Sequence, residues 1–293
     1  MALKIKGLVF RNKYTREGLK AEKNKVNLEY FRDAINLGDS LSGVVCEYML
    51  AQKGLSFSTR SREKYSHLIA IGSLLGGRGF FDAVVWGGGV RSFSEAASLG
   101  KRKYIQKLDI RAVRGPVSRQ ILQQAGKYTC PEIYGDPAIL MPEIYPSSPQ
   151  KSNKVALVSH FLSYDTIPEE NADCIKKIDI RTTDYAQFID EITKCSKVIS
   201  SSLHGIILAE SYGIPAVFLG KCREIEWLKY YDWYFSTHRT NIRIAHSVKE
   251  ALEMDPLPLP KLNEMRSNLI ASFPYDLWEN DRQHTCACNR GTK

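Results

Sequence analysis

The sequence contains no apolar run long enough to cross a membrane, and its first residues do not resemble a secretion signal. A spanning helix needs about 20 apolar residues in succession. The opening "MALKIKGLVFRNKYTREG" has neither an apolar signal core nor a small-residue cleavage site. With 43% hydrophobic and 25% charged residues, the composition is that of a soluble globular protein. We therefore expect a cytoplasmic protein.

Two nucleotide-binding signatures are also missing. The glycine run "WGGG" (residues 86–89) lacks the G-x-G-x-x-G spacing of dinucleotide sites, and no P-loop lysine follows it. Neither NAD nor a P-loop nucleotide is therefore expected, and no cofactor is predicted.

The seven cysteines form neither a disulfide framework nor a zinc site. Their number is odd and most are widely scattered, which favours reduced thiols. Only His284, Cys286 and Cys288 in "HTCACN" cluster, and no second cluster at zinc-site spacing accompanies them. We predict no metal site.

The formal charge of +9 comes from basic residues that are spread along the chain. The densest short runs are residues 60–64 and 100–103, and no nucleic-acid module accompanies them. Nucleic acid is therefore not an expected partner. Such a charge favours substrates that carry phosphate and carboxylate, or loose contact with an anionic membrane face.

Short apolar runs alternate with helical segments along most of the chain, which predicts an α/β protein with parallel sheets. Strands are predicted at residues 26–31, 67–75, 82–90, 109–113, 154–161, 178–181, 197–201 and 215–220. Helices are predicted at residues 41–54, 114–126, 185–195 and 203–212.

A polar, proline-containing stretch at residues 142–153 indicates a linker, and 293 residues suit two domains. We predict a Rossmann-like domain at residues 1–148, a second at 149–258, and a closing helix with a tail at 259–293. The two Rossmann-like domains would face each other across a cleft.

The segment "SSSLHGIILAESYGIPAVFLG" (residues 200–220) carries the strongest candidate site. A strand, a helix that ends near Gly213, and another strand form a β-α-β unit, so the first turn of the helix lies at the carboxyl end of the sheet. Helix N-termini bind anions. Three serines and His204 at this turn suit an anion site, although a capping serine and a space-filling histidine would give the same letters.

Further candidates lie in other turns. Gly38, Gly88 and Gly89 permit close approach of the backbone to a ligand. Asp39 is a carboxylate just before a helix, where it could also be an N-cap. Arg114 could hold a carboxylate or phosphate with two parallel bonds, or could form an ordinary ion pair.

Asp136 and the aromatic segment 226–239 each allow two interpretations. Asp136 in "YGDPAIL" could be a catalyst, but the turn residue is favoured because Asp-Pro is itself turn chemistry. The aromatic segment 226–239 could stack on sugar rings, or it could be a half-buried amphipathic helix.

Seven blocks together resemble the polysaccharide pyruvyl transferases, and most closely the xanthan-type branch. The resemblance spans residues 26–278 and rests on "NLGDSL", "VVWGGGV", "DIRAVRGPVS", "IYGDPAIL", "VISSSLHGIILAESYGIPAVFLG", "KYYDWYFSTHR" and "ASFPYDLW". It implies a glycosyltransferase-B-like fold and transfer of pyruvate from phosphoenolpyruvate to two sugar hydroxyls as a cyclic ketal.

The resemblance and the residues together give a set of expected roles. His204 would donate a proton to the methylene carbon or neutralise the developing charge, and Asp39 would deprotonate the attacking hydroxyl. The donor would bind in the second domain, and the acceptor in the first. Donor-binding residues are predicted as Arg114, Ser201, Ser202, Lys221 and Arg239, and acceptor-binding residues as Gly88, Gly89, Lys229 and Trp233.

Two residues depart from the family pattern. Many relatives have arginine where this chain has Ser202, and Arg239, Lys221 or Arg223 could replace that charge. His238 stands where the branch commonly has glycine, which makes the placement of Arg239 less certain.

Two other classes of function stay open. A nucleotide-sugar glycosyltransferase would use the same fold, and a non-catalytic protein could bind polyanions through its basic surface.

The acceptor is expected to be a lipid-linked oligosaccharide or polysaccharide repeat unit at the inner membrane face. Its sugar and the positions of the ketal are not given by the sequence.

Overall fold

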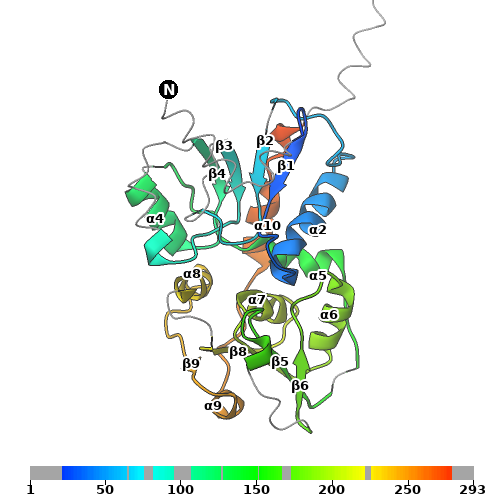
Figure 1. The fold of residues 1–293 in the computed structure, drawn as a ribbon, viewed down its shortest axis with the longest axis vertical. Helices are drawn as coiled ribbons and strands as arrows, with labels where there is room; N and C mark the ends of the chain where they lie inside the picture. Colours follow the sequence, from blue (N-terminus) through cyan, green and yellow to red (C-terminus); the bar gives the residue numbers. More distant parts are fainter. Residues whose placement is uncertain are drawn as a thin grey trace, which may run out of the picture.

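The computed structural model describes residues 22–64, 66–75, 82–95, 107–126, 128–150, 152–166, 173–221 and 226–278. These residues form a mixed α/β structure with two parallel sheets, one of four strands and one of five. The predicted fold class is confirmed at this level. The first sheet lies in the upper half of Figure 1 and the second in the lower half.

The first sheet has the strand order β1-β2-β3-β4, with every pair parallel. Its apolar strands are covered by helices, as is usual for parallel sheets. The strands are β1 (Val26–Glu29), β2 (Ser66–Ile69), β3 (Asp82–Trp86) and β4 (Lys107–Ala112), and the helices are α2 (Leu37–Ala51) and α4 (Pro116–Gly126).

Helix α2 begins four residues before its predicted start at residue 41, and its N-cap is Asn36. Gly38 and Asp39 therefore lie in the first helical turn, not in the turn that precedes the helix. Helix α4 was predicted from Arg114, but it begins at Pro116, a residue whose missing N–H costs nothing at a helix start.

The second sheet has the order β6-β5-β7-β8-β9, and all its pairs are parallel. The strands are β5 (Val155–Val158), β6 (Ile175–Ile178), β7 (Lys197–Ser200), β8 (Ala216–Leu219) and β9 (Ile244–Ala245). The helical segments are η2 (Tyr164–Thr166), α6 (Tyr185–Thr193), α7 (Leu203–Ser211), α8 (Leu228–Ser236) and α9 (Val248–Glu253).

Strand β6 lies three residues before its predicted position at 178–181, which was wrong. Ile180 is apolar and buried, but it lies beyond the strand. Its carbonyl instead accepts the N–H of Leu37 at 2.9 Å, so it connects the second sheet to the start of α2. Ile180 is apolar because it is buried in a loop contact, and the sequence alone does not distinguish this from an apolar residue of a strand.

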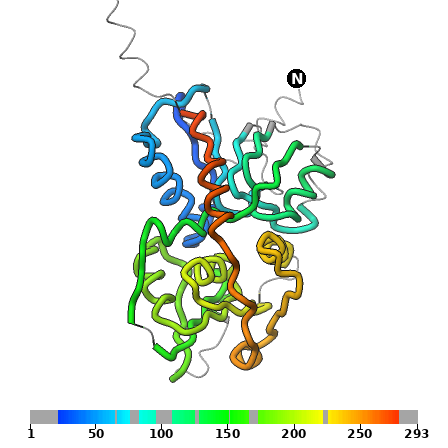
Figure 2. Tube along the Cα trace, turned by 180° about the vertical axis from the view of Figure 1, so that it is seen from behind, coloured from blue at the N-terminus to red at the C-terminus, as the bar shows by residue number. Residues whose placement is uncertain are grey.

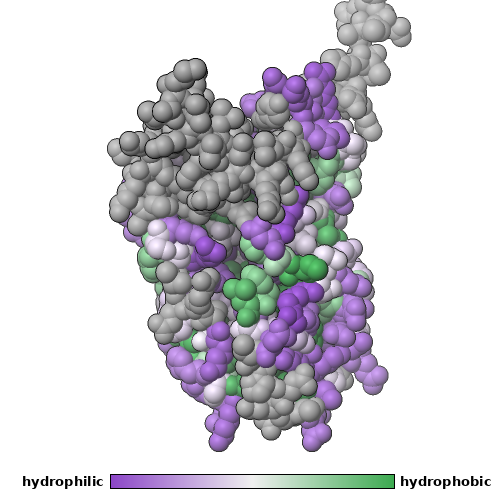
Figure 3. All heavy atoms as spheres, in the orientation of Figure 1, coloured by the Kyte–Doolittle hydropathy of each residue, from purple (hydrophilic) through white to green (hydrophobic). Residues whose placement is uncertain are grey.

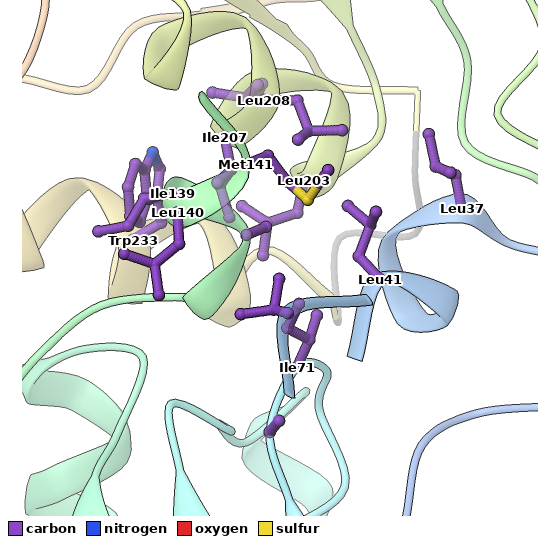
Figure 4. Packing of buried hydrophobic residues seen from close by; sticks show 14 of the residues in the cluster. Leu37, Leu41, Ile71, Ile139, Leu140, Met141, Leu203, Ile207, Leu208 and Trp233 are labelled. Carbon is purple, nitrogen blue, oxygen red and sulfur yellow. The ribbon is translucent and has the colours of Figure 1, made fainter. Parts of the chain in front are cut away.

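The short helices η1 (Pro137–Leu140) and α5 (Met141–Ile144) follow the first sheet and pack between α2 and α7. The predicted linker at 142–153 was thus wrong at its start, because residues 142–144 are helical. Figure 4 shows apolar side chains from these elements, from α8 and from the loop after β2 in one buried cluster. The labelled residues are Leu37, Leu41, Ile71, Ile139, Leu140, Met141, Leu203, Ile207, Leu208 and Trp233.

The C-terminal segment returns from the second sheet to the first, as the orange-to-red tube in Figure 2 shows. It contains α10 (Asn263–Ala271), at the place of the predicted closing helix, and η4 (Tyr275–Leu277). The indole N–H of Trp86 donates to the Leu269 carbonyl at 2.8 Å. The two sheets lie on either side of the predicted boundary at residue 148, and the boundary itself stays a prediction.

Candidate functional site

A cavity of about 1560 Å³ lies between loops that follow strands of both sheets. Ser73 after β2, His160 after β5 and Ser202 after β7 all line it. In parallel sheets the carboxyl ends of the strands share one edge, which is where ligands usually bind. The volume exceeds the roughly 300–1,000 Å³ of ordinary small-molecule sites, so there is room for more than one small molecule.

The surface also has apolar parts. Leu162, which lines the cavity, is 63% exposed. In Figure 3, apolar surface gathers at mid-height on one face, between the two halves of the molecule.

His204 is the second residue of α7 and lines the cavity, so its predicted place in the first helical turn is confirmed. The residue is only 8% exposed. Its Nδ1 lies over Gly38 of α2, where an added Cβ would be 1.8 Å away. Gly38 thus gives room to a protein side chain, and not to a ligand as the sequence suggested.

Asp136 lies next to His204, and the sequence favoured a turn residue over a catalyst at this position. It does cap η1, because its Oδ1 accepts the N–H of Ala138 at 3.0 Å. Its Oδ2, however, lies 3.5 Å from His204 Nε2. Within the described part of the chain, neither of these two buried atoms has a hydrogen-bond partner. A carboxylate so placed can neutralise a protonated imidazole and hold its orientation.

The three serines before α7 have different environments. The Ser200 hydroxyl lies 2.8 Å from the carbonyls of Val158 and Ser202. The Ser201 hydroxyl accepts the N–H of His160 at 2.8 Å. Ser202 lines the cavity as the N-cap residue, and no described group forms a capping bond with its side chain. The N-terminus of α7, with its partial positive charge, therefore meets the cavity.

Asp39 lines the same cavity from the first turn of α2. The side-chain amide of Asn36 donates to Asp39 Oδ2 at 2.7 Å. An added Cβ at Gly72 would lie 2.7 Å from Asp39 Oδ1. The alternative that Asp39 is the N-cap is wrong, since Asn36 has that position. Its role as a base stays a prediction.

Arg114 lines the cavity but is almost fully buried and already has partners. One terminal nitrogen donates to Ser73 Oγ at 2.7 Å, and the other donates to the Val90 carbonyl at 2.6 Å and lies 3.2 Å from Asp232 Oδ2. The third guanidinium nitrogen, Nε, is buried and has no hydrogen-bond partner among the described residues. A bidentate bond to a donor carboxylate would compete with these contacts.

Gly88 and Gly89 are not among the described residues that line the cavity. An added Cβ at Gly88 would meet Ile69 at 2.9 Å, and one at Gly89 would meet the Arg114 guanidinium at 2.6 Å. The glycine run therefore makes room for packed protein groups. Contact with an acceptor at these two residues stays a prediction.

Trp233 and Arg239 lie in a buried network around Glu210 of α7. Glu210 Oε2 accepts the Trp233 indole N–H and one Arg239 nitrogen, each at 2.8 Å. Burial first, and the Glu210 charge second, raise the pKa of the neighbouring Tyr234 hydroxyl. Neither Trp233 nor Arg239 belongs to the described cavity lining. The helical reading of this segment fits α8.

The other basic candidates have different positions. Lys221 is exposed and is not in the described lining, and Arg223 lies outside the described residues. Lys229 does line the cavity, although it is 9% exposed. Its Nζ donates to Glu226 Oε2 at 3.0 Å.

His160 and Glu226 also line the cavity and were missed by the sequence reasoning. His160 Nε2 lies 3.7 Å from Glu226 Oε2, and both residues are buried. A signal was present in "VSHF", where His160 follows β5 much as His204 follows β7.

No group of histidine, cysteine and acidic residues suited to a metal ion occurs in the described ranges. The cluster His284, Cys286 and Cys288 lies outside them. The described helices likewise include none that is long and apolar enough to span a bilayer.

Comparison with known proteins gives one family and several distant likenesses. The chain is 25% identical over 226 residues to "Uncharacterized protein L143" of Acanthamoeba polyphaga mimivirus, with 73% of this chain and 75% of that one covered.

Among solved structures, it is similar to the functionally uncharacterized protein KP1_0663 of Klebsiella pneumoniae, at 13% identity and a TM-score of 0.49, over 84% of this chain and 99% of that one. It is also similar to the wall teichoic acid polymerase TagF, at 11% identity and a TM-score of 0.39, over 92% and 88%.

A family model described as polysaccharide pyruvyl transferase matches residues 10–221, more than half of the chain. The match begins before the blocks that carry the sequence resemblance and ends before the last two of them. The resemblance to the family is thereby confirmed. This chain belongs to the polysaccharide pyruvyl transferase family.

Proposed function

We propose that this chain transfers pyruvate from phosphoenolpyruvate to two hydroxyls of one sugar in a bacterial surface-polysaccharide repeat unit, forming a cyclic ketal and releasing phosphate. Membership of the family supports the transferred group. The observation that carries the chemistry is the buried His204–Asp136 pair at the N-terminus of α7, beside a cavity with room for donor and acceptor.

The donor is a small anion, and the cavity offers positive groups for it. The N-terminus of α7 suits phosphate or carboxylate, and the Arg114 side chain adds a positive charge at the cavity wall. Lys229 and Arg91 line the cavity and could supply the charge that is missing at Ser202. Lys221 and Arg239 are less suited to that role, because they are outside the described lining.

The first half of the reaction needs a base and an acid. Asp39 takes the proton of the first hydroxyl as its oxygen bonds to C2 of phosphoenolpyruvate. The C2=C3 electron pair then takes a proton from His204, so the methylene becomes a methyl group. Asp136 Oδ2 holds the protonated ring in place through this step. The second hydroxyl then attacks C2 and loses its proton to a further base, and phosphate leaves with its bonding electron pair.

The wider setting is part of the proposal. Loops from both parallel sheets line one cavity, which supports a glycosyltransferase-B-like arrangement with the donor on the second sheet and the acceptor on the first. The xanthan-type branch is the expected subgroup, with phosphoenolpyruvate as co-substrate and neither cofactor nor metal. The net charge of +9 favours loose contact with the anionic inner membrane face.

The test uses phosphoenolpyruvate with a panel of aryl glycosides of glucose, galactose and N-acetylhexosamines. Mass spectrometry should detect the ketal product, and an assay should detect equimolar phosphate. We expect His204→Gln to lower the rate by about 100-fold or more, while the exposed control His246→Gln stays near wild type. Turnover by His204→Gln at the wild-type rate would refute the assigned role.

Two parallel experiments address the alternatives. Binding of a labelled nucleotide sugar without any reaction of phosphoenolpyruvate would favour a glycosyltransferase. Salt-sensitive binding to acidic polymers that survives His204→Ala, again without turnover, would favour a polyanion-binding protein. Sedimentation with anionic vesicles at low salt tests the membrane contact separately.

A further inference from the structure

The cavity contains a second imidazole–carboxylate pair that the first half of the proposed reaction does not use. His160 Nε2 faces Glu226 Oε2 at 3.7 Å, as His204 Nε2 faces Asp136 Oδ2 at 3.5 Å. All four residues are buried. His160 and His204 both line the cavity, so two groups able to move protons are available in one space.

The sheet places the two histidines at the same edge. Strands β5 and β7 are neighbours in parallel register, and their last paired residues are Val158 and Ser200. His160 and His204 lie shortly beyond these ends. The backbone of His160 also donates to Ser201 Oγ, so the loop after β5 is fixed to the loop after β7.

The hydrogen bonds around Glu226 indicate which member of the second pair can act as a base. His160 Nδ1 accepts the N–H of Leu162 at 3.4 Å, so in the neutral ring the proton is on Nε2, which faces Glu226. Lys229 Nζ donates to the same carboxylate oxygen at 3.0 Å. His160 and Lys229 thus position Glu226. With the His160 Nδ1 lone pair engaged by Leu162 and the Lys229 Nζ donating, the Glu226 carboxylate is the best-placed proton acceptor of the three.

We propose that Glu226 is the base for the second hydroxyl, with His160 as its positioning residue; this rests on the proposed function. After the first addition, C2 carries the sugar oxygen, phosphate, carboxylate and a methyl group. The second O–H bond breaks towards the Glu226 carboxylate, its oxygen bonds to C2, and the C2–O bond to phosphate breaks with its electron pair on phosphate. The proton on Glu226 then passes to the departing phosphate or to water.

This division of labour separates two measurable events. Protonation of C3 belongs to the first half, so in D2O its reversal places deuterium in recovered phosphoenolpyruvate. Ring closure belongs to the second half and is measured as ketal. Loss of a base that serves only the second half should lower ketal formation without lowering deuterium incorporation.

The experiment compares wild type, Glu226→Gln and the exposed control Glu253→Gln in D2O, with phosphoenolpyruvate and an aryl glycoside that wild type converts. We expect Glu226→Gln to keep deuterium incorporation within about 3-fold of wild type and to lose about 100-fold or more in ketal formation. An adduct in which one sugar oxygen is bonded to C2 and the phosphate is retained should accumulate. Glu253→Gln should match wild type in both measurements.

His160→Asn serves as the second variant if Glu226→Gln does not fold, and we expect it to show a smaller loss in the same direction. Equal loss of deuterium incorporation and ketal formation by a folded variant would overturn the inference, and so would full ketal formation. If wild type neither labels nor consumes phosphoenolpyruvate with any glycoside of the panel, the proposed function itself fails, and this inference fails with it.

Discussion

The Arg114 guanidinium lies 3.2 Å from the Asp232 carboxylate, and both side chains are almost fully buried between α4 and α8. Asp232 also accepts the N–H of Ser118 at 3.0 Å and its hydroxyl at 2.6 Å. A single carboxylate therefore neutralises a buried cation and satisfies the N-terminus of α4 from another helix. An added Cβ at Gly115 would lie 2.0 Å from the Asp232 carbonyl, so the two helices are in close contact.

We expect Asp232→Asn to lower the free energy of unfolding by about 3–5 kcal/mol, because it leaves the Arg114 charge buried without its counter-charge. The control is Asp276→Asn, which removes one of the two carboxylate partners of the partly exposed Arg111 and should cost below about 1 kcal/mol. Urea denaturation of both variants measures the difference. Equal losses would show that the buried Arg114–Asp232 pair contributes no more to stability than the Arg111–Asp276 pair.

His238 occupies a backbone position that glycine normally takes. It follows α8 with φ of 59°, and the N–H groups of His238 and Arg239 donate to Phe235 and Tyr234 at 3.1 and 2.9 Å. This is the Schellman pattern, in which C′ is left-handed. Gly213 after α7 has the same pattern, with φ of 72°.

We expect His238→Gly to raise the free energy of unfolding by about 0.5–1 kcal/mol, since glycine removes the Cβ strain of this conformation. The reverse change, Gly213→Ala, should lower it by a similar amount, because open space around Gly213 leaves the backbone as the only cost. Thermal unfolding of the two variants and of wild type measures both changes in stability. The expectation fails if both changes move stability in the same direction.

The sequence predicted well what local pattern determines. The alternation of strands and helices predicted two parallel sheets, and the β-α-β unit placed His204 in the first turn of α7. The unusual position of His238 was noticeable as a departure from glycine, and its positive φ gives the reason.

What the sequence could not give are contacts between residues far apart along the chain. The Asp136–His204 contact depends on how η1 packs between α2 and α7. Asp136 also has a local role as a cap, so the turn explanation was sufficient by itself. For Trp233 and Arg239 the same letters suit a sugar site or a buried network, and only the tertiary position of Glu210 distinguishes them.

Asp190 of α6 gives a pH-dependent prediction. Hydrogen bonds from the hydroxyls of Ser147 and then Tyr145 lower the pKa of its carboxyl. A lowered pKa in the folded state adds stability above the unfolded-state pKa, and this increment is lost as the pH falls from about 5 through the folded-state value.

The difference in unfolding free energy between wild type and Asp190→Asn should therefore shrink as the pH falls over that range. Urea denaturation at several pH values measures it. Asp173→Asn, at an exposed aspartate outside this hydrogen-bond network, is the control and should show a smaller change. A difference that grows on acidification would contradict the assignment.

Gly38 and Gly43 of α2 offer a matched test of how His204 is positioned. An added Cβ at Gly38 would lie 1.8 Å from His204 Nδ1, whereas nothing lies within 4 Å of one at Gly43. Alanine favours a helix over glycine by about 1 kcal/mol, so Gly43→Ala should stabilise the protein. Gly38→Ala brings the same gain in propensity but displaces the imidazole.

We expect Gly38→Ala to reduce ketal formation by about 100-fold or more, because an error of about 1 Å in a catalytic group can cost that much. The NMR signals of the His204 ring should shift in Gly38→Ala and stay in place in Gly43→Ala. Phosphate release and these spectra measure the two effects independently. If Gly38→Ala kept both the wild-type rate and the wild-type His204 signals, the close packing of α2 against the imidazole could not be what holds the ring beside Asp136.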